Sequence, residues 1–195
     1  MSKLVVISGP SGAGKGTVVK ELLNIYKENN DKVHLSISIT TRKIREGEID
    51  GVSYYFVSED DFKNKINNNE LLEYNKYGTG KYYGTLKSHV FEFLENGYDV
   101  ILEIDINGYK QVINNYKGAI GIFVTTPSLD VLEKRLRDRK TETEEQIISR
   151  LQTAKIEMEN KDIYPYIIVN EDNKSKEAAL KIYKIIKEEE KSVDL

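Results

Sequence analysis

The sequence predicts an α/β fold in which helices cover both faces of a central parallel sheet, as a three-layer sandwich. Two observations lead to this class. Short β-branched runs without polar alternation are typical of strands buried on both faces, and stretches of helical apolar spacing separate them. The expected central strands are residues 4–7, 100–105, 120–124 and 167–169. With 195 residues, 39% of them hydrophobic, the chain is large enough for a single domain with a substantial core.

In chain order, the strand at 4–7 meets a glycine-rich turn, and a helix is expected over 15–28. Alternation of apolar and polar residues predicts a strand over 33–39, followed by a polar loop over 40–53. Ser58 and Asp61 form a capping box, which predicts a helix that continues to residue 68. The other elements expected before the second central strand are strands at 54–57, 71–74 and 81–84 and a helix over 88–96 that ends at Gly97.

Helical spacing dominates the last third of the chain. Ser128 is expected to cap a helix through Arg137, with Leu129, Leu132 and Leu136 on one face. Thr143 and Gln146 form a capping box for a long helix. The apolar stripe of that helix is Ile147, Leu151, Ala154 and Met158, and an amphipathic helix over 176–190 follows the last strand.

Composition excludes several classes of function. The chain carries 29 Lys+Arg against 32 Asp+Glu, a net charge of -3, so it has no basic field for a nucleic-acid backbone. It has no cysteine, which excludes disulfides, zinc–thiolate sites, Fe–S clusters and a cysteine nucleophile. No run approaches the roughly 20 apolar residues of a membrane helix, and the run at 4–7 is too short for a signal peptide. We therefore expect a cytoplasmic protein that binds neither nucleic acid nor membrane.

A phosphate-binding loop of the P-loop NTPase type is expected between the first strand and the first helix. The pattern G-x-x-x-x-G-K is formed by Gly9, Pro10, Ser11, Gly12, Ala13, Gly14 and Lys15. The loop backbone and the helix N-terminus attract an anion, and Lys15 reaches the outer phosphates. Gly16 stands where Ser or Thr is usual, so the hydroxyl that faces Mg²⁺, directly or through water, is assigned to Thr17. This loop alone does not distinguish a kinase from a GTPase or a motor ATPase.

Two arginines in the following polar loop indicate a second anion site. Arg42 and Arg45 lie three residues apart and precede the aromatic run 54–56. Arginine binds phosphate through two parallel N–H bonds, so the pair is suited to clamp a phosphate. A solvated basic loop is the alternative that this pattern leaves open.

Several further motifs accompany the phosphate loop. They are S-x-T-T-R-x-x-R-x-G-E from Ser38, and residues 54–56, 71–73, 82–85 and 102–105, followed by Arg135, Arg139, residues 141–143, Arg150 and Asn170. Together with the phosphate loop, these motifs occur in the order and spacing of guanylate kinases, and the chain resembles that family over nearly its whole length.

The resemblance implies transfer of the γ-phosphoryl group of Mg-ATP to GMP within one domain, residues 1–195. It implies a core of 1–35, 89–125 and 158–195, a GMP-binding insert of 36–88 and a helical lid of 126–157. ATP and GMP are the expected partners, dGMP is left open, and no obligate protein partner is expected.

The resemblance also assigns roles to individual residues. The GMP phosphate is assigned to Arg42, Arg45, Tyr54 and Tyr83, and the guanine to Ser38, Glu73, Thr85, Glu103 and Asp105. The transferred phosphoryl group is assigned to Lys15, Arg42, Arg135, Arg139 and Arg150. Asn170 is assigned to the adenine side, where Arg135 can flank the base. Some family members carry Asp where this chain has Glu103.

Chemistry supports Glu73 as the group that reads the base. Guanine presents N1–H and the 2-amino group side by side, and one carboxylate accepts from both, whereas adenine presents an acceptor at N1. No general base is required, because an acceptor phosphate with a second pKa of about 6 is already largely a dianion at neutral pH. Two other functions remain as alternatives: a nucleoside monophosphate kinase of different base choice, and a catalytically silent interaction domain.

Overall fold

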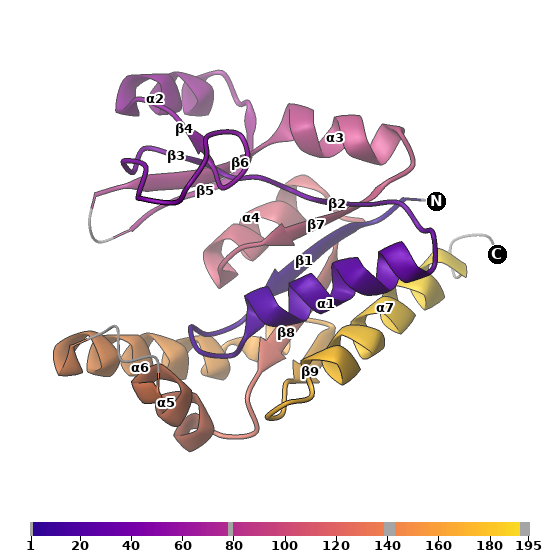
Figure 1. Ribbon diagram of the computed structural model, residues 1–195. Helices are drawn as coiled ribbons and strands as arrows, with labels where there is room; N and C mark the ends of the chain where they lie inside the picture. Colours follow the sequence, from indigo (N-terminus) through magenta and orange to yellow (C-terminus); the bar gives the residue numbers. More distant parts are fainter. Residues whose placement is uncertain (1, 78–79, 139–142, 192–195) are drawn as a thin grey trace.

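The computed structural model describes residues 2–77, 80–138 and 143–191. Its core is a parallel sheet with the strand order β2-β7-β1-β8-β9 (Figure 1). The strands are β2 (Val33–Leu35), β7 (Asp99–Glu103), β1 (Leu4–Ser8), β8 (Ile120–Thr125) and β9 (Tyr166–Val169). The sheet confirms the predicted parallel architecture.

Helices cover both faces of this sheet (Figure 1). On one face, α1 (Lys15–Glu28) and α7 (Ser175–Lys191) pack against each other and against Val5 and Ile7. On the other face, α3 (Lys87–Glu95) and α4 (Ile106–Asn115) cover Leu4 and Val6. Successive strand residues point to opposite faces, so the unbroken apolar run of β1 supplies both halves of the core.

A second, mixed sheet lies beside the core with the order β4-β3-β6-β5. Its strands are β4 (Tyr55–Phe56), β3 (Ile39–Thr40), β6 (Tyr82–Leu86) and β5 (Leu71–Lys76), and α2 (Glu59–Asn67) packs on it through the buried Phe62. The single strand predicted over 33–39 is wrong. The chain leaves the core sheet at Ser36, whose N–H still donates to Ile101 at 2.9 Å, and enters the second sheet at Ile39.

Three further expectations are corrected. No element is predicted from the sequence for residues 106–119, yet α4 forms there. Its N-cap is Asp105, whose carboxylate accepts from the Gly108 N–H at 2.8 Å, a signal present in the sequence. The last strand, β9, lies at the sheet edge rather than at its centre, so Ile167 remains 41% exposed. Leu129 is 37% exposed and does not share the buried face of its helix.

Two helices form a separate projection after β8 (Figure 1). They are α5 (Leu129–Asp138) and α6 (Glu144–Glu159), the latter followed by a 3-10 turn, Lys161–Ile163. Their shared core is Leu132, Leu136, Ile147 and Ala154. The predicted capping box is confirmed, because Thr143 and Gln146 each accept a backbone N–H of the other. Among the described residues, no helix is both long and apolar enough to cross a membrane.

Candidate active site

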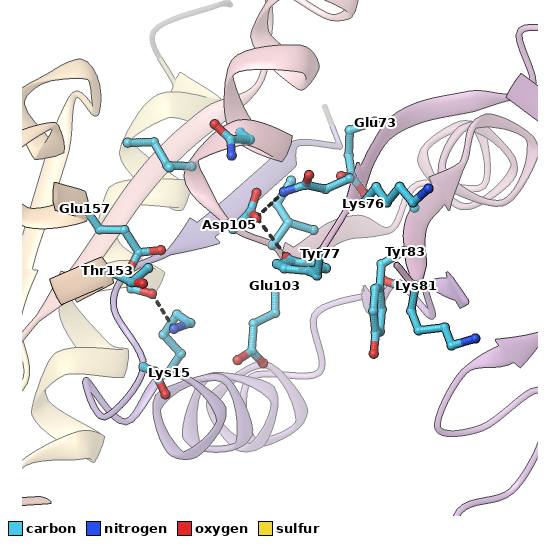
Figure 2. Close-up of a pocket in the computed structure, with 18 of the residues that line it drawn as sticks. Lys15, Glu73, Lys76, Tyr77, Lys81, Tyr83, Glu103, Asp105, Thr153 and Glu157 are labelled. Atoms are coloured by element: carbon cyan, nitrogen blue, oxygen red, sulfur yellow. Dashed lines mark hydrogen bonds between the residues drawn. The ribbon is translucent and has the colours of Figure 1, made fainter. Parts of the chain in front are cut away.

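A cavity of about 1120 Å³ opens between the phosphate loop, the second sheet and α6. Figure 2 shows Lys15 and Glu103 near one end and Lys81 and Tyr83 near the other. The structure brings together many of the sequence-predicted residues on its walls: Gly9, Ser11, Lys15, Ser38, Arg42, Arg45, Tyr54, Glu73, Tyr83, Glu103, Asp105 and Arg150. Two groups of cations therefore share one cavity with several carboxylates.

The phosphate loop is held tightly by its surroundings. Gly9 has a φ of 146°, and a Cβ there would lie 2.0 Å from the Val124 carbonyl oxygen. Gly14 is left-handed, and a Cβ there would lie 2.6 Å from Asn170 Nδ2. The ammonium of Lys15 donates to the Gly9 carbonyl at 2.5 Å and to the Pro10 carbonyl at 3.1 Å. The loop thus requires glycine at both positions. The Lys15 side chain folds back and bonds to the loop backbone.

Arg42 occupies an aromatic and acidic corner of the second sheet. Its two terminal nitrogens donate to the Glu48 carboxylate at 2.9 and 2.7 Å. Its guanidinium lies 5.3 Å from the ring centroid of Tyr54, which itself packs edge-on to Tyr83. The Arg42 hydrogen bonds lower the pKa of Glu48 to about 2, so this carboxylate stays ionised and orients the fork. Arg45 lies exposed nearby, with its backbone N–H bound to Glu48.

Glu73 is a buried carboxylate on β5, only 5% exposed. Thr85 on β6 donates its hydroxyl to Glu73 Oε1 at 2.6 Å. The pKa of Glu73 is raised to about 7: burial is the main cause, the charge of Asp105 adds to the increase, and the Thr85 hydrogen bond opposes it. A carboxyl group whose pKa lies near neutral pH and which lines a cavity is typical of a functional site.

Asp105 links the end of β5, the strand that carries Glu73, to α4. Besides capping the helix, it accepts from Asn75 Nδ2 at 2.7 Å and from the Tyr77 hydroxyl at 2.8 Å, as Figure 2 shows. Asn75 and Tyr77 also line the cavity and were not predicted from the sequence. Their only sequence signal is their position two and four residues after Glu73.

One face of α6 lines the cavity opposite Glu103. Arg150, Thr153 and Glu157 are spaced by three and four residues, and Arg150 donates to the Ser11 hydroxyl at 2.5 Å. Burial raises the pKa of Glu157 to about 7, against the attraction of Lys15. Glu103 is exposed to the cavity, and partial desolvation by the cavity walls raises its pKa as well. Glu157 was not predicted, although its helical spacing from Arg150 would have indicated it.

Other predicted residues lie behind the phosphate loop. Asn170 is 2% exposed and donates to the Ala13 carbonyl at 2.8 Å, so it supports the loop from below. Arg135 donates to Asp172, Asn170 and Ala13. Predicted residues absent from the cavity lining are Pro10, Gly12, Ala13, Gly14, Gly16, Thr17, Thr85, Arg135 and Asn170. Thr17 is exposed in the first turn of α1, and Arg139 is outside the described residues.

The parallel sheet, the glycine loop at the carboxyl end of its central strand β1 and the adjoining cavity define a P-loop nucleotide-binding protein. The sequence model of one family, described as guanylate kinase, matches residues 1–189. The chain belongs to the guanylate kinase family.

Individual relatives agree over most of the chain. A guanylate kinase of Clostridium tetani is 50% identical over 191 residues, covering 98% of this chain and 88% of that protein. A guanylate kinase of Carboxydothermus hydrogenoformans is 50% identical over 169 residues, covering 87% and 80%. The crystal structure of guanylate kinase from Anaplasma phagocytophilum superposes with a TM-score of 0.74 at 28% identity, covering 96% of this chain and 86% of that one.

Proposed function

We propose that the cavity binds ATP and GMP together and transfers the γ-phosphoryl group, giving ADP and GDP. As a guanylate kinase family member, the protein is an ATP:GMP phosphotransferase. The observation that carries the assignment to this cavity is that Lys15 of the phosphate loop and the buried Glu73 line the same space. The arrangement suits a phosphate donor at one end and a guanine at the other.

GMP is bound in this proposal by the second sheet. Arg42, Arg45, Tyr54 and Tyr83 hold its phosphate, supported by the bidentate Glu48 contact that fixes the Arg42 fork. The guanine site consists of Ser38, Glu73, Thr85, Glu103 and Asp105. Within it, Thr85 acts by orienting the Glu73 carboxylate through its hydrogen bond. Base choice then depends on a carboxylate that the surrounding protein already buries.

ATP is bound by the loop from Gly9 to Thr17, with Lys15 directed to the outer phosphates and Asn170 on the adenine side. Among the described residues, no cluster of three or more His, Cys, Asp or Glu can hold a metal. The Thr17 hydroxyl, an oxygen donor exposed in the first turn of α1, suits Mg²⁺ that arrives with the nucleotide phosphates. When bound, Mg²⁺ neutralises phosphate charge.

The transfer step requires positioning rather than a covalent intermediate. An oxygen of the GMP phosphate forms a bond to the γ-phosphorus while the bond from that phosphorus to the bridging oxygen of ADP breaks. Lys15, Arg42 and Arg150 neutralise the charge that spreads over the transferred group, and we propose the same for Arg135 and Arg139. The acceptor is already a dianion, so no proton needs to be removed from it.

The division into a core, a GMP-binding insert and a lid is part of the same proposal. The second sheet spans residues 39–86, within the proposed insert, and α5 and α6 share a small core of their own. Closure of these parts over both nucleotides would exclude water, which otherwise competes with GMP as acceptor.

The first test is ADP formation from Mg-ATP with GMP, AMP, CMP or UMP offered separately. We expect rapid turnover with GMP alone, because only guanine presents two adjacent N–H donors to Glu73. A preference for another monophosphate would support a kinase of different base choice. GMP binding without turnover would support an interaction domain.

GMP affinity is expected to fall as the pH is lowered from about 8 to about 6. Because the pKa of Glu73 is about 7, the carboxylate is mostly ionised at about pH 8 and mostly protonated at about pH 6. Only the ionised form accepts from both guanine donors, so the Kd for GMP should rise about tenfold across the range, as measured by calorimetry. Glu73→Gln is the control, because its remaining pH dependence reports the GMP phosphate, with a second pKa of about 6. Equal slopes in both proteins would contradict this prediction.

A further inference from the structure

The helix α4 lies along the open edge of β5 (Figure 1). β5 is the last strand of its sheet, with β6 on one side only, and an edge strand leaves backbone N–H and C=O groups without a ladder partner. Gln111 accepts from the Tyr74 N–H at 3.1 Å and donates to the Tyr74 C=O at 2.8 Å. Asn115 donates to the Leu72 C=O at 2.8 Å. Two side-chain amides therefore take the place of a neighbouring strand.

These bonds fall on the residues immediately before and after Glu73. On the other side of β5, the pairing with β6 shifts register between Leu71 and Glu73. Such irregularities redirect the side chains next to them, so the ladder alone does not fix the direction of the carboxylate. The amides of Gln111 and Asn115 hold the strand where its regular pairing is interrupted.

The same face of α4 also contacts the carboxylate itself. Gly108, Gln111 and Asn115 are separated by three and four residues and share one face of the helix. A Cβ at Gly108 would lie 2.7 Å from Glu73 Oε2, so the carboxylate rests against the helix backbone. The helix joins β7 to β8 of the core sheet and thereby connects Glu73 to the sheet that carries the phosphate loop.

We propose that Gln111 and Asn115 are positioning residues for base specificity: they hold β5 so that the Glu73 carboxylate meets the guanine edge. The inference rests on the proposed function, since it deepens the account of the GMP site. Loss of these amides leaves Glu73 present but free to shift, and a shift of about 1 Å weakens both hydrogen bonds to the base. At the phosphate end of the cavity, Arg42 is held by Glu48 and does not depend on these amides.

The test is the double variant Gln111→Leu/Asn115→Leu, with each single variant alongside. We expect the KM for GMP to rise about tenfold while the KM for ATP is unchanged. The preference for GMP over inosine monophosphate, which lacks the 2-amino group, should fall about tenfold, because this preference depends on carboxylate placement. The matched control is Asn114→Leu, an exposed amide on the same helix, which should leave all three quantities unchanged.

The outcomes separate a positioning role from a structural one. A lower Tm and kcat with unchanged KM for GMP and unchanged base preference would overturn the proposal, as would no change at all. Neither KM nor base preference depends on the folded fraction, so partial unfolding does not imitate the expected result. Kd values for GMP and inosine monophosphate are measured by calorimetry in parallel. These Kd values test the proposal even if no monophosphate is phosphorylated. Absence of phosphorylation would overturn the proposed function instead.

Discussion

Lys15→Ala is expected to lower kcat for phosphoryl transfer to GMP by about 10³-fold, the scale of losing one preorganised charge from a transition state. The lysine ammonium is held at the mouth of the phosphate loop by the Gly9 and Pro10 carbonyls. It stands between the loop and two carboxylates, Glu103 and Glu157, and its charge opposes the rise in their pKa values that desolvation causes. Without the lysine, this cation no longer offsets the repulsion between the donor phosphates and the two carboxylates. Steady-state measurement of ADP formation with saturating substrates gives the effect.

The matched control for this prediction is Lys20→Ala, which removes an exposed lysine from the same helix. We expect it to behave as the unmodified protein. The Kd for GMP should be the same in both variants, because Lys15 faces the donor rather than the acceptor. Retention of more than about a tenth of kcat in Lys15→Ala would contradict the assigned role.

The phosphate loop was predictable because all its determinants are local. A buried strand, a glycine pattern and a helix follow one another within residues 4–28, and the structure has β1 and α1 there. The packing behind the loop was not predictable from the residues alone. Asn170 lies more than 150 positions away, and the distance between Gly14 and Asn170 Nδ2 depends on how α7 and β9 pack.

At the GMP end of the cavity, the residues were predicted by family resemblance rather than by local pattern, and the helix that supports them was not predicted. Family resemblance indicated Glu73 and Thr85, and the structure adds the hydrogen bond between them. The contacts of α4 were missed because no helix was predicted over residues 106–115. Glycine at 108 and two asparagines near the end weaken the helical pattern there, and packing of Tyr109 and Val112 into the core overrides that weakness. Elements stabilised by tertiary contacts are those that local patterns predict least well.

Glu73→Gln is expected to lower kcat/KM for GMP by about a hundredfold and to reduce the preference for GMP over AMP. Thr85 donates to Oε1, so the glutamine oxygen takes that position and the amide nitrogen takes the place of Oε2. An N–H donor then faces a guanine donor, while adenine, with an acceptor at N1 and a donor at its 6-amino group, is matched by an amide. Kinetics with GMP and AMP measure the change.

The same substitution is expected to stabilise the fold, which separates lost chemistry from lost structure. A pKa raised by burial from 4.5 to about 7 means that folding disfavours the ionised Glu73 by about 3 kcal/mol. This cost is absent below the unfolded pKa, grows as the pH rises through the folded pKa, and is removed by the neutral amide. Thermal unfolding at about pH 8 should therefore give a higher Tm for Glu73→Gln than for the unmodified protein, and a smaller difference at about pH 5. The exposed Glu95→Gln should change neither stability nor base preference. An unchanged GMP preference in Glu73→Gln would refute its role as the base reader, whereas reduced activity with a raised Tm would identify a buried charge kept for recognition at the expense of stability.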